Sequence, residues 1–277
     1  MSLLVTSAYG ANGNGYGAVL AFNGNGKLLG RFSDDSRIVD PRGLALDPTE
    51  GLLLLNSGQD RILALSSSGA VVRDSGWIEG LNPGGGNLGP DGRYYVGLRS
   101  LRMVMAFPTA LDAIGEHFVL PGVVPFPRGF AFGRDGRFFL ASGIGPNGLG
   151  DNSIVAFDPK NRSQPSQFVN DPALSPLDLT IAPNGNLIVS SEHPFGAADA
   201  VTSIREYDAV DGHLVRVFAP DGLAEFRGPR GLRFGPDGNL YCVTQTEVVV
   251  FNFSSGEFLG TFLRLPRLYG QALVHFP

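Results

Sequence analysis

Residues 41–48 read PRGLALDP, and the same outline returns four times farther along the chain. Each copy begins with Pro-x-Gly or a near variant, continues with alternating apolar residues and ends in a Pro/Asp/Asn-Gly turn. A segment that recurs this regularly indicates one supersecondary unit that is used many times. The later copies are PGGGNLGPDG at 83–92, PRGFAFGRDG at 127–136, PLDLTIAPNG at 176–185 and PRGLRFGPDG at 229–238.

Length and composition favour one closed all-β domain that spans residues 1–277. The chain is 43% hydrophobic, which is enough to bury a large core, and its 39 glycines and 20 prolines suit short strands joined by tight turns. Each complete repeat contains four short runs that are rich in β-branched and aromatic residues. No stretch favours a helix.

The two ends of the chain complement one another. The N-terminal unit has three strand-like runs before the first Pro-Arg-Gly, and the tail YGQALVHF at 269–276 has the outline of an inner strand. The sequence therefore predicts a six-bladed β-propeller of four-stranded antiparallel blades, in which the C-terminal strand completes the N-terminal blade and closes the ring. Closure of this kind leaves no open sheet edge.

Charge and cysteine content exclude several classes of partner. The net charge is −5 and there is no basic tract, so we expect no nucleic-acid partner. The single Cys242 excludes an internal disulfide and disfavours a metal site built from cysteines. No run approaches the ~18 apolar residues that a membrane helix needs. Because no leader precedes the first strand-like run, we expect a soluble, cytoplasmic protein.

The repeat resembles a known family. LLLLNSGQDRILAL at 52–65, together with the Pro-x-Gly outline, is similar to the NHL repeat, and the resemblance covers nearly the whole chain. It implies the same six-bladed propeller. NHL-like propellers serve as enzymes, as protein-binding modules and as RNA-binding modules, so the resemblance leaves the function open.

One face of the predicted propeller carries the irregular loops. In a four-stranded blade, the start of the inner strand and the loop between the second and third strands lie on the same face. Three of these loops are long, at 8–16, 142–152 and 191–203. Long loops without structure of their own are more often functional than short ones, so we expect the ligand to bind on this face.

Three arginines occupy the middle position of Pro-x-Gly at the channel mouth. Arg42, Arg128 and Arg230 belong to alternate units, which lie about 120° apart in a six-fold ring. Their guanidinium groups can converge on one carboxylate or phosphate, which suits a small anionic molecule or an acidic peptide. The alternative is local pairing with carboxylates such as Asp40. We expect no bound cofactor.

Other residues are placed near the same mouth by the repeat pattern. Glu192 and His193 follow a strand there and are candidates for an acid and a base, although a solvated loop start is the favoured explanation for them. The further candidates for ligand binding are Asn56, Arg99, Ser142, Asp178, Gln245 and Tyr269.

An enzymatic alternative comes from two more distant resemblances. Gluconolactonases and senescence-marker proteins are similar propellers that hold a divalent cation through oxygen ligands at the starts of inner strands. This chain has Arg, Gly and Leu at those starts, so we expect no metal there. Streptogramin lyase is also similar, and Glu192 and His193 could stand in for its metal-site residues. A metal-assisted hydrolase or lyase is therefore the alternative function.

Overall fold

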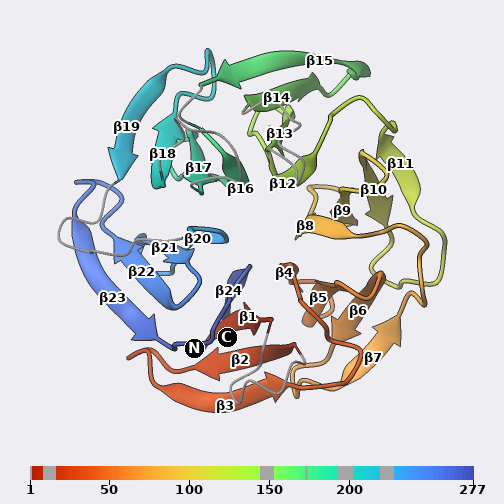
Figure 1. Ribbon diagram of the computed structural model, residues 1–277, viewed down its shortest axis with the longest axis vertical. Helices are drawn as coiled ribbons and strands as arrows, with labels where there is room; N and C mark the ends of the chain where they lie inside the picture. Colours follow the sequence, from red (N-terminus) through yellow and green to blue (C-terminus); the bar gives the residue numbers. More distant parts are fainter. Residues whose placement is uncertain (1, 9–16, 144–152, 172–173, 193–201, 219–227) are drawn as a thin grey trace.

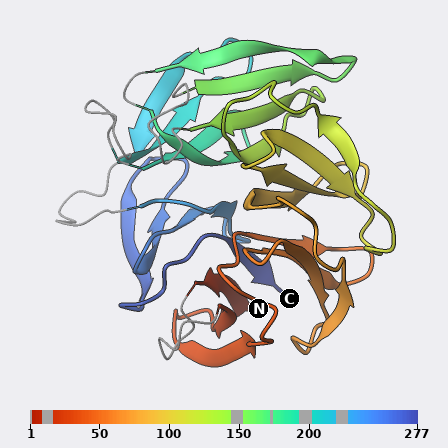
Figure 2. The same cartoon turned by 45° about the vertical axis from the view of Figure 1, so that its right-hand side comes forward.

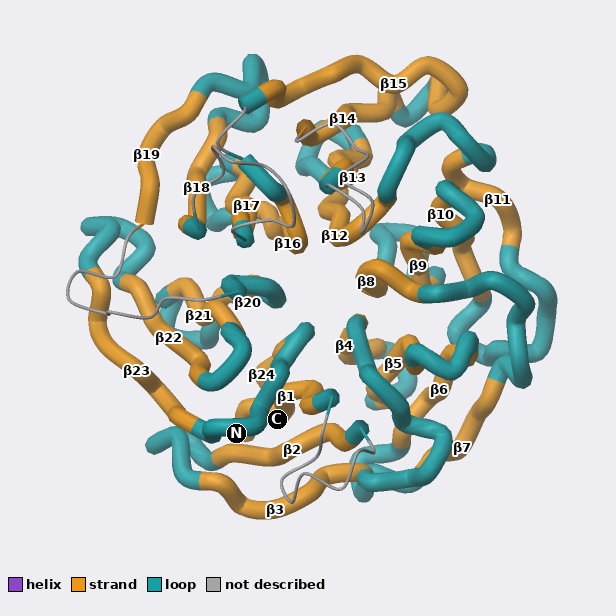
Figure 3. Tube along the Cα trace, viewed as in Figure 1, coloured by secondary structure: helices purple, strands orange, loops and turns teal. Residues whose placement is uncertain are grey.

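A computed structural model of the chain describes residues 2–8, 17–143, 153–171, 174–192, 202–218 and 228–277. These residues form 24 strands in six four-stranded antiparallel sheets and contain no helix (Figures 1 and 3). The predicted all-β propeller of six blades is thus confirmed. None of the described residues belongs to a helix long and apolar enough to cross a membrane.

Every blade is a meander whose strands run in order from the channel to the rim (Figure 1). Blade 1 contains β24 (Leu273–Phe276), β1 (Ser2–Ser7), β2 (Ala18–Phe22) and β3 (Leu28–Ser33). Blade 2 contains β4 (Gly43–Asp47), β5 (Leu52–Ser57), β6 (Arg61–Leu65) and β7 (Val71–Asp74). Blade 3 contains β8 (Pro83–Leu88), β9 (Tyr94–Leu98), β10 (Met103–Phe107) and β11 (Glu116–Val119).

The remaining three blades repeat this order. Blade 4 contains β12 (Pro127–Phe132), β13 (Phe138–Ser142), β14 (Ser153–Asp158) and β15 (Asn161–Asn170). Blade 5 contains β16 (Pro176–Ile181), β17 (Leu187–Ser191), β18 (Ser203–Tyr207) and β19 (Leu214–Phe218). Blade 6 contains β20 (Leu232–Phe234), β21 (Leu240–Val243), β22 (Glu247–Phe251) and β23 (Phe258–Arg264).

The inner strands form a closed ring. Each inner strand contacts the inner strand of the next blade, in the order β24, β4, β8, β12, β16, β20 and back to β24. Blades 3 and 6 therefore lie on opposite sides of the channel (Figure 1). In the turned view of Figure 2, the C-terminal strand in dark blue lies beside the N-terminal strand in dark red.

Closure of the ring depends on pairing between the two ends of the chain. β24 pairs antiparallel with β1, with Leu273 opposite Val5 and Phe276 opposite Ser2. Thr6 extends the junction, because its hydroxyl oxygen accepts the backbone N–H of Ala272 at 2.9 Å. The predicted closure by the C-terminal strand is confirmed, although the paired strand is shorter than the predicted 269–276.

The turns on the face where the inner strands end follow the repeat. In GPDG at 89–92, the N–H of Gly92 donates to the carbonyl of Gly89 at 3.1 Å. The final glycine has a φ of +77° at Gly92 and +85° at Gly136, a backbone region that strongly favours glycine. This requirement explains why Asp/Asn-Gly recurs after the inner strands of blades 3 to 6.

The apolar faces of the blades are buried against each other. Among the described residues, the buried side chains gather in six clusters, and each cluster lies between two adjacent blades. In the part of the chain that the structure describes, no blade has a core of its own. The ring is therefore stabilised as a whole, and it holds the starts of the six inner strands in fixed positions around the channel mouth.

Candidate functional site

The channel mouth contains a cavity of about 150 Å³ on the face where the inner strands begin. Residues from the starts of all six inner strands line it. Its lining is rich in glycine and arginine, so much of the wall is backbone from which long charged side chains project. The charged lining residues are Arg42, Arg99, Arg128, Arg230, Arg233, Asp178 and Glu192.

Arg42 bridges blades 2 and 3. Its Nε donates to Asp40 at 2.8 Å, and one terminal nitrogen donates to the carbonyl of Pro83 at 3.1 Å. The alternative pairing considered from the sequence, with Asp40, is therefore present. It does not remove Arg42 from the cavity, because the side chain lines the cavity and stays 20% exposed.

Blade 3 supplies an arginine by a different route. Gly84 occupies the position where blades 2, 4 and 6 carry arginine, and Arg99 reaches this place from the end of β9. A Cβ at Gly84 would lie 3.2 Å from Cγ of Arg99, so the missing side chain makes room for it. Arg99 donates from a terminal nitrogen to Oδ1 of Asn82 at 2.6 Å, which fixes its direction.

Arg128 is packed flat between an aromatic ring and backbone. Its guanidinium carbon lies 5.3 Å from the ring centroid of Phe126, and Arg99 lies 5.8 Å from the same ring. On the other side, a Cβ at Gly143 would lie only 2.5 Å from Nε of Arg128. Stacking on an aromatic face suits a guanidinium and holds it in one orientation.

The electrostatics of Arg128 show that several charges share the mouth. Burial lowers the pKa of Arg128 to about 10, and the carboxylate of Glu192 opposes this shift. Arg230 and Arg42 lower the pKa further, because like charges nearby disfavour the protonated form. Arg128 stays charged at neutral pH, and the three arginines are close enough to repel one another.

Arg230 meets Glu192 at the side of blades 5 and 6. A terminal nitrogen of Arg230 lies 3.3 Å from Oε1 of Glu192, and Nε of Arg230 is buried without a hydrogen-bond partner among the described residues. Gly228 lies next to both Glu192 and Gln245. A Cβ at Gly228 would be 3.1 Å from Oε1 of Glu192 and 3.0 Å from Cγ of Gln245. Gln245 thus lies near the mouth but does not line the cavity.

Arg233 and Asp178 form an ion pair in the cavity wall. Arg233 donates to Oδ2 of Asp178 at 3.2 Å, and the backbone N–H of Leu232 donates to the same oxygen at 3.1 Å. Burial raises the pKa of Asp178, while Arg233 and the backbone donors act in the opposite direction. Asp178 was expected from the sequence, but Arg233 was missed.

Some further expected residues are placed away from the cavity or outside the described part of the chain. Asn56 and Ser142 are fully buried, and neither lines the cavity. Asn56 lies behind the wall, where its Oδ1 would be 2.2 Å from a Cβ at Gly43. His193 lies outside the described residues, as do most of the three long loops.

In blade 1, the cavity-lining residue is Gln271. Leu273 pairs with Val5 in blade 1 as Leu44 pairs with Leu55 in blade 2. Gln271 and Arg42 each lie two residues before the paired leucine, so Gln271 is the counterpart of Arg42. Tyr269 is 41% exposed and is not part of the lining. The sequence alignment of the tail was therefore two residues out of register.

The described residues around the cavity carry an excess of positive charge. Five arginines line it, and the carboxylates beside them are Asp40, Asp178 and Glu192, which leaves an excess of two positive charges. The excess lies on the side of blades 3 and 4, because Asp40, Asp178 and Glu192 face Arg42, Arg233 and Arg230. The described lining is therefore electropositive on that side of the cavity.

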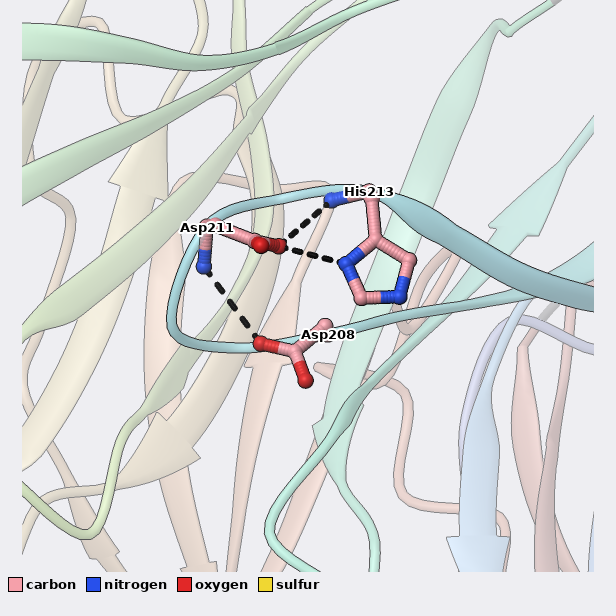
Figure 4. A group of neighbouring side chains, drawn as sticks. All are labelled: Asp208, Asp211 and His213. Carbon is pink, nitrogen blue, oxygen red and sulfur yellow. Dashed lines mark hydrogen bonds and ion pairs between the residues drawn. The ribbon is translucent and has the colours of Figure 1, made fainter.

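The donors in the cavity do not suit a divalent cation. Hard cations require several oxygen ligands, and the two carboxylates of the described lining each face an arginine. Elsewhere among the described residues, Asp208, Asp211 and His213 approach one another in the exposed turn between β18 and β19 (Figure 4). Hydrogen bonds within the turn, such as His213 Nδ1 to Asp211 at 2.6 Å, account for this arrangement.

Comparisons with known proteins bear on the fold. No protein-family model matches the chain, and a search of curated proteins also gives no match. Among solved structures, one from a nidogen/laminin complex superposes with a TM-score of 0.75 at 13% identity, covering 98% of this chain and 97% of that one. This superposition shows that the chain shares the propeller fold of that structure.

Two enzymes named in the sequence analysis are among the structural neighbours. A gluconolactonase from Xanthomonas campestris has a TM-score of 0.66 at 18% identity, covering 97% of this chain and 86% of that chain. A streptogramin B lyase has a TM-score of 0.60 at 15% identity, covering 82% and 70%. The resemblance to these propellers is confirmed at the level of the fold, which is all that such low identities show.

Proposed function

We propose that this protein binds a small anionic molecule, or an acidic side chain of a peptide, at the channel mouth. The observation that carries the proposal is the convergence of Arg42, Arg128 and Arg230 on one cavity, together with Arg99 and Arg233. These arginines come from three separate regions of the repeat, and the closed ring holds them against their mutual repulsion.

The physical argument concerns the cost of an empty site. Like charges in one cavity repel one another. Burial is the main cause of the lowered pKa of Arg128, and the charges of Arg230 and Arg42 lower this pKa further. A bound anion relieves this repulsion and accepts hydrogen bonds from fork-shaped donors. A cavity of about 150 Å³ favours a ligand of few atoms, because a cavity of about that volume in another protein holds one benzene molecule.

A metal-assisted hydrolase or lyase remains the alternative function. Its support is the fold, which this chain shares with proteins named gluconolactonase and streptogramin B lyase. Its weakness is the donor set, because the described lining offers Asp178 and Glu192 next to arginines. The anion-binding proposal needs no group beyond those that line the cavity.

Melting temperature against anion concentration tests the proposal. Phosphate should stabilise the wild type in proportion to RT ln(1 + [L]/Kd). Each charge-assisted contact contributes roughly 1.5–3 kcal/mol, so Arg42→Met, Arg128→Met and Arg230→Met should each weaken binding about tenfold or more. The empty variants should be as stable as the wild type or more so.

Arg31→Met provides the matched control. Arg31 pairs with Asp34 at the rim strand β3 and is 26% exposed, close to the 23% of Arg230. Removing it takes away one positive charge without touching the cavity. If phosphate stabilises the wild type, the control and the three cavity variants equally, the arginines are not the binding site and the proposal fails.

A further inference from the structure

Glu192 is an unusual component of an anion site. It is an acidic side chain in the lining of a cavity that five arginines share, and only 15% of it is exposed. Its position is fixed from two sides, by Arg230 at 3.3 Å and by the backbone of Gly228, which leaves room for the carboxylate because it has no side chain.

The second oxygen of Glu192 is available to a ligand. Oε1 faces Arg230, and Oε2 has no hydrogen bond to any residue that the structure describes. The carboxylate lines the same cavity as Arg128 and Arg230, and its negative charge raises the pKa of Arg128. An anion held by Arg128 and Arg230 therefore comes to lie against Glu192.

An ionised carboxylate only accepts hydrogen bonds. A fully deprotonated oxyanion such as sulfate would place a negatively charged oxygen against Oε2 of Glu192, which is repulsive and leaves both oxygens unpaired. An oxyanion that keeps one proton at neutral pH, such as inorganic phosphate, can donate an O–H···O⁻ bond there, and such bonds are short and strong. A site with one well-placed group of this kind rejects the ligand that cannot pair with it.

We infer that Glu192 makes the channel mouth select oxyanions that carry a proton, of which hydrogenphosphate is the simplest, over fully deprotonated ones. This inference rests on the proposed function. It goes beyond it by naming the ligand chemistry: phosphate is preferred to sulfate, and Glu192 determines the preference while the arginines supply most of the affinity.

The test is a pair of calorimetric titrations at pH 7 and constant ionic strength, one with inorganic phosphate and one with sulfate. The wild type should bind phosphate at least about tenfold more tightly than sulfate. In Glu192→Gln the two affinities should come within about threefold of each other, mainly because sulfate binds more tightly once the negative charge is gone.

Glu247→Gln is the matched control for this substitution. Glu247 is 11% exposed and pairs with Arg264 at 2.5 Å, away from the cavity, so its removal should leave the preference unchanged. Arsenate and selenate give a second pair of tetrahedral anions that differ in the same way. They test the inference on the wild type alone if Glu192→Gln folds poorly.

The outcomes separate this inference from the proposed function. If phosphate and sulfate bind the wild type equally through the arginines, the proposed function holds and the role of Glu192 is wrong. If Glu192→Gln keeps the full preference for phosphate over sulfate, a group other than Glu192 accepts the hydrogen bond from the protonated anion, and the inference is also wrong. If neither anion binds, the proposed function fails, and this inference fails with it.

Discussion

Replacing Leu273 by alanine should destabilise the whole propeller, because this residue joins the two ends of the chain. Leu273 is fully buried and packs in the cluster between blades 1 and 6 with Val5, Val243 and Leu268. Truncation of a fully buried leucine removes apolar burial and leaves a cavity, which together cost about 3 kcal/mol. At roughly 2–4 °C per kcal/mol, the melting temperature should fall by about 6–12 °C.

The assay is chemical unfolding. The dependence of the free energy of unfolding on denaturant concentration should be the same as in the wild type, so that a shift in the denaturant midpoint reports stability alone. Leu259→Ala is the control, since Leu259 lies at the rim on β23 and is 50% exposed, and it should change stability by no more than about 0.5 kcal/mol. If Leu273→Ala unfolds within about 0.5 kcal/mol of the wild type, the C-terminal strand does not hold the ring closed.

Three further predictions concern the mouth and the closing strand. Gly143→Ala should displace Arg128, because the new Cβ would lie 2.5 Å from Nε of Arg128. Calorimetry should then show phosphate binding that is several-fold weaker, and an unchanged affinity would contradict this prediction. Asp178→Leu should lower the free energy of unfolding by about 2 kcal/mol or more, because Arg233 loses its paired carboxylate. A variant as stable as the wild type in chemical unfolding would show that the ion pair does not stabilise the fold. Burial lowers the pKa of His275 in the folded protein below its unfolded-state pKa near 6.5. The stability that neutral His275 contributes is therefore present above pH 6.5 and is lost as the pH falls through the folded-state pKa. His275→Gln should therefore lose less stability than the wild type between pH 7 and pH 5, and parallel pH profiles would contradict the assignment.

The fold could be predicted because the repeat encodes it locally. The Asp/Asn-Gly turns require a left-handed glycine, and the alternating apolar residues of each inner strand pack between blades. Closure also followed from sequence, because a three-stranded unit at one end and a spare strand at the other allow one arrangement without an open edge.

The site was only partly predictable, because side chains reach the mouth by routes that the repeat does not encode. Arg42, Arg128 and Arg230 were found from their shared position. Arg233 was missed, although a charged residue in a strand otherwise holding Leu and Phe was a signal that it faces the channel. Gln271 was missed because nothing in the tail fixed its register, which is set by pairing with β1.

The ends of the second strands were misleading for a different reason. Asn56 and Ser142 lie at the ends of second strands that run toward the mouth, but the inner strand covers them, so they are buried behind its backbone. Sequence places them on the correct face of the propeller. It does not reveal the depth of a side chain within a blade, which depends on packing against the neighbouring blade.

The most direct test of the account is a crystal structure of the protein soaked in arsenate, with anomalous diffraction recorded at the arsenic edge. The account predicts that the strongest anomalous peak lies in the channel mouth, within hydrogen-bond distance of Arg128 and Arg230 and of an oxygen of Glu192. A cavity without an arsenic peak, at a concentration that fills other sites on the surface, would contradict the claim that this cluster of arginines binds an anion.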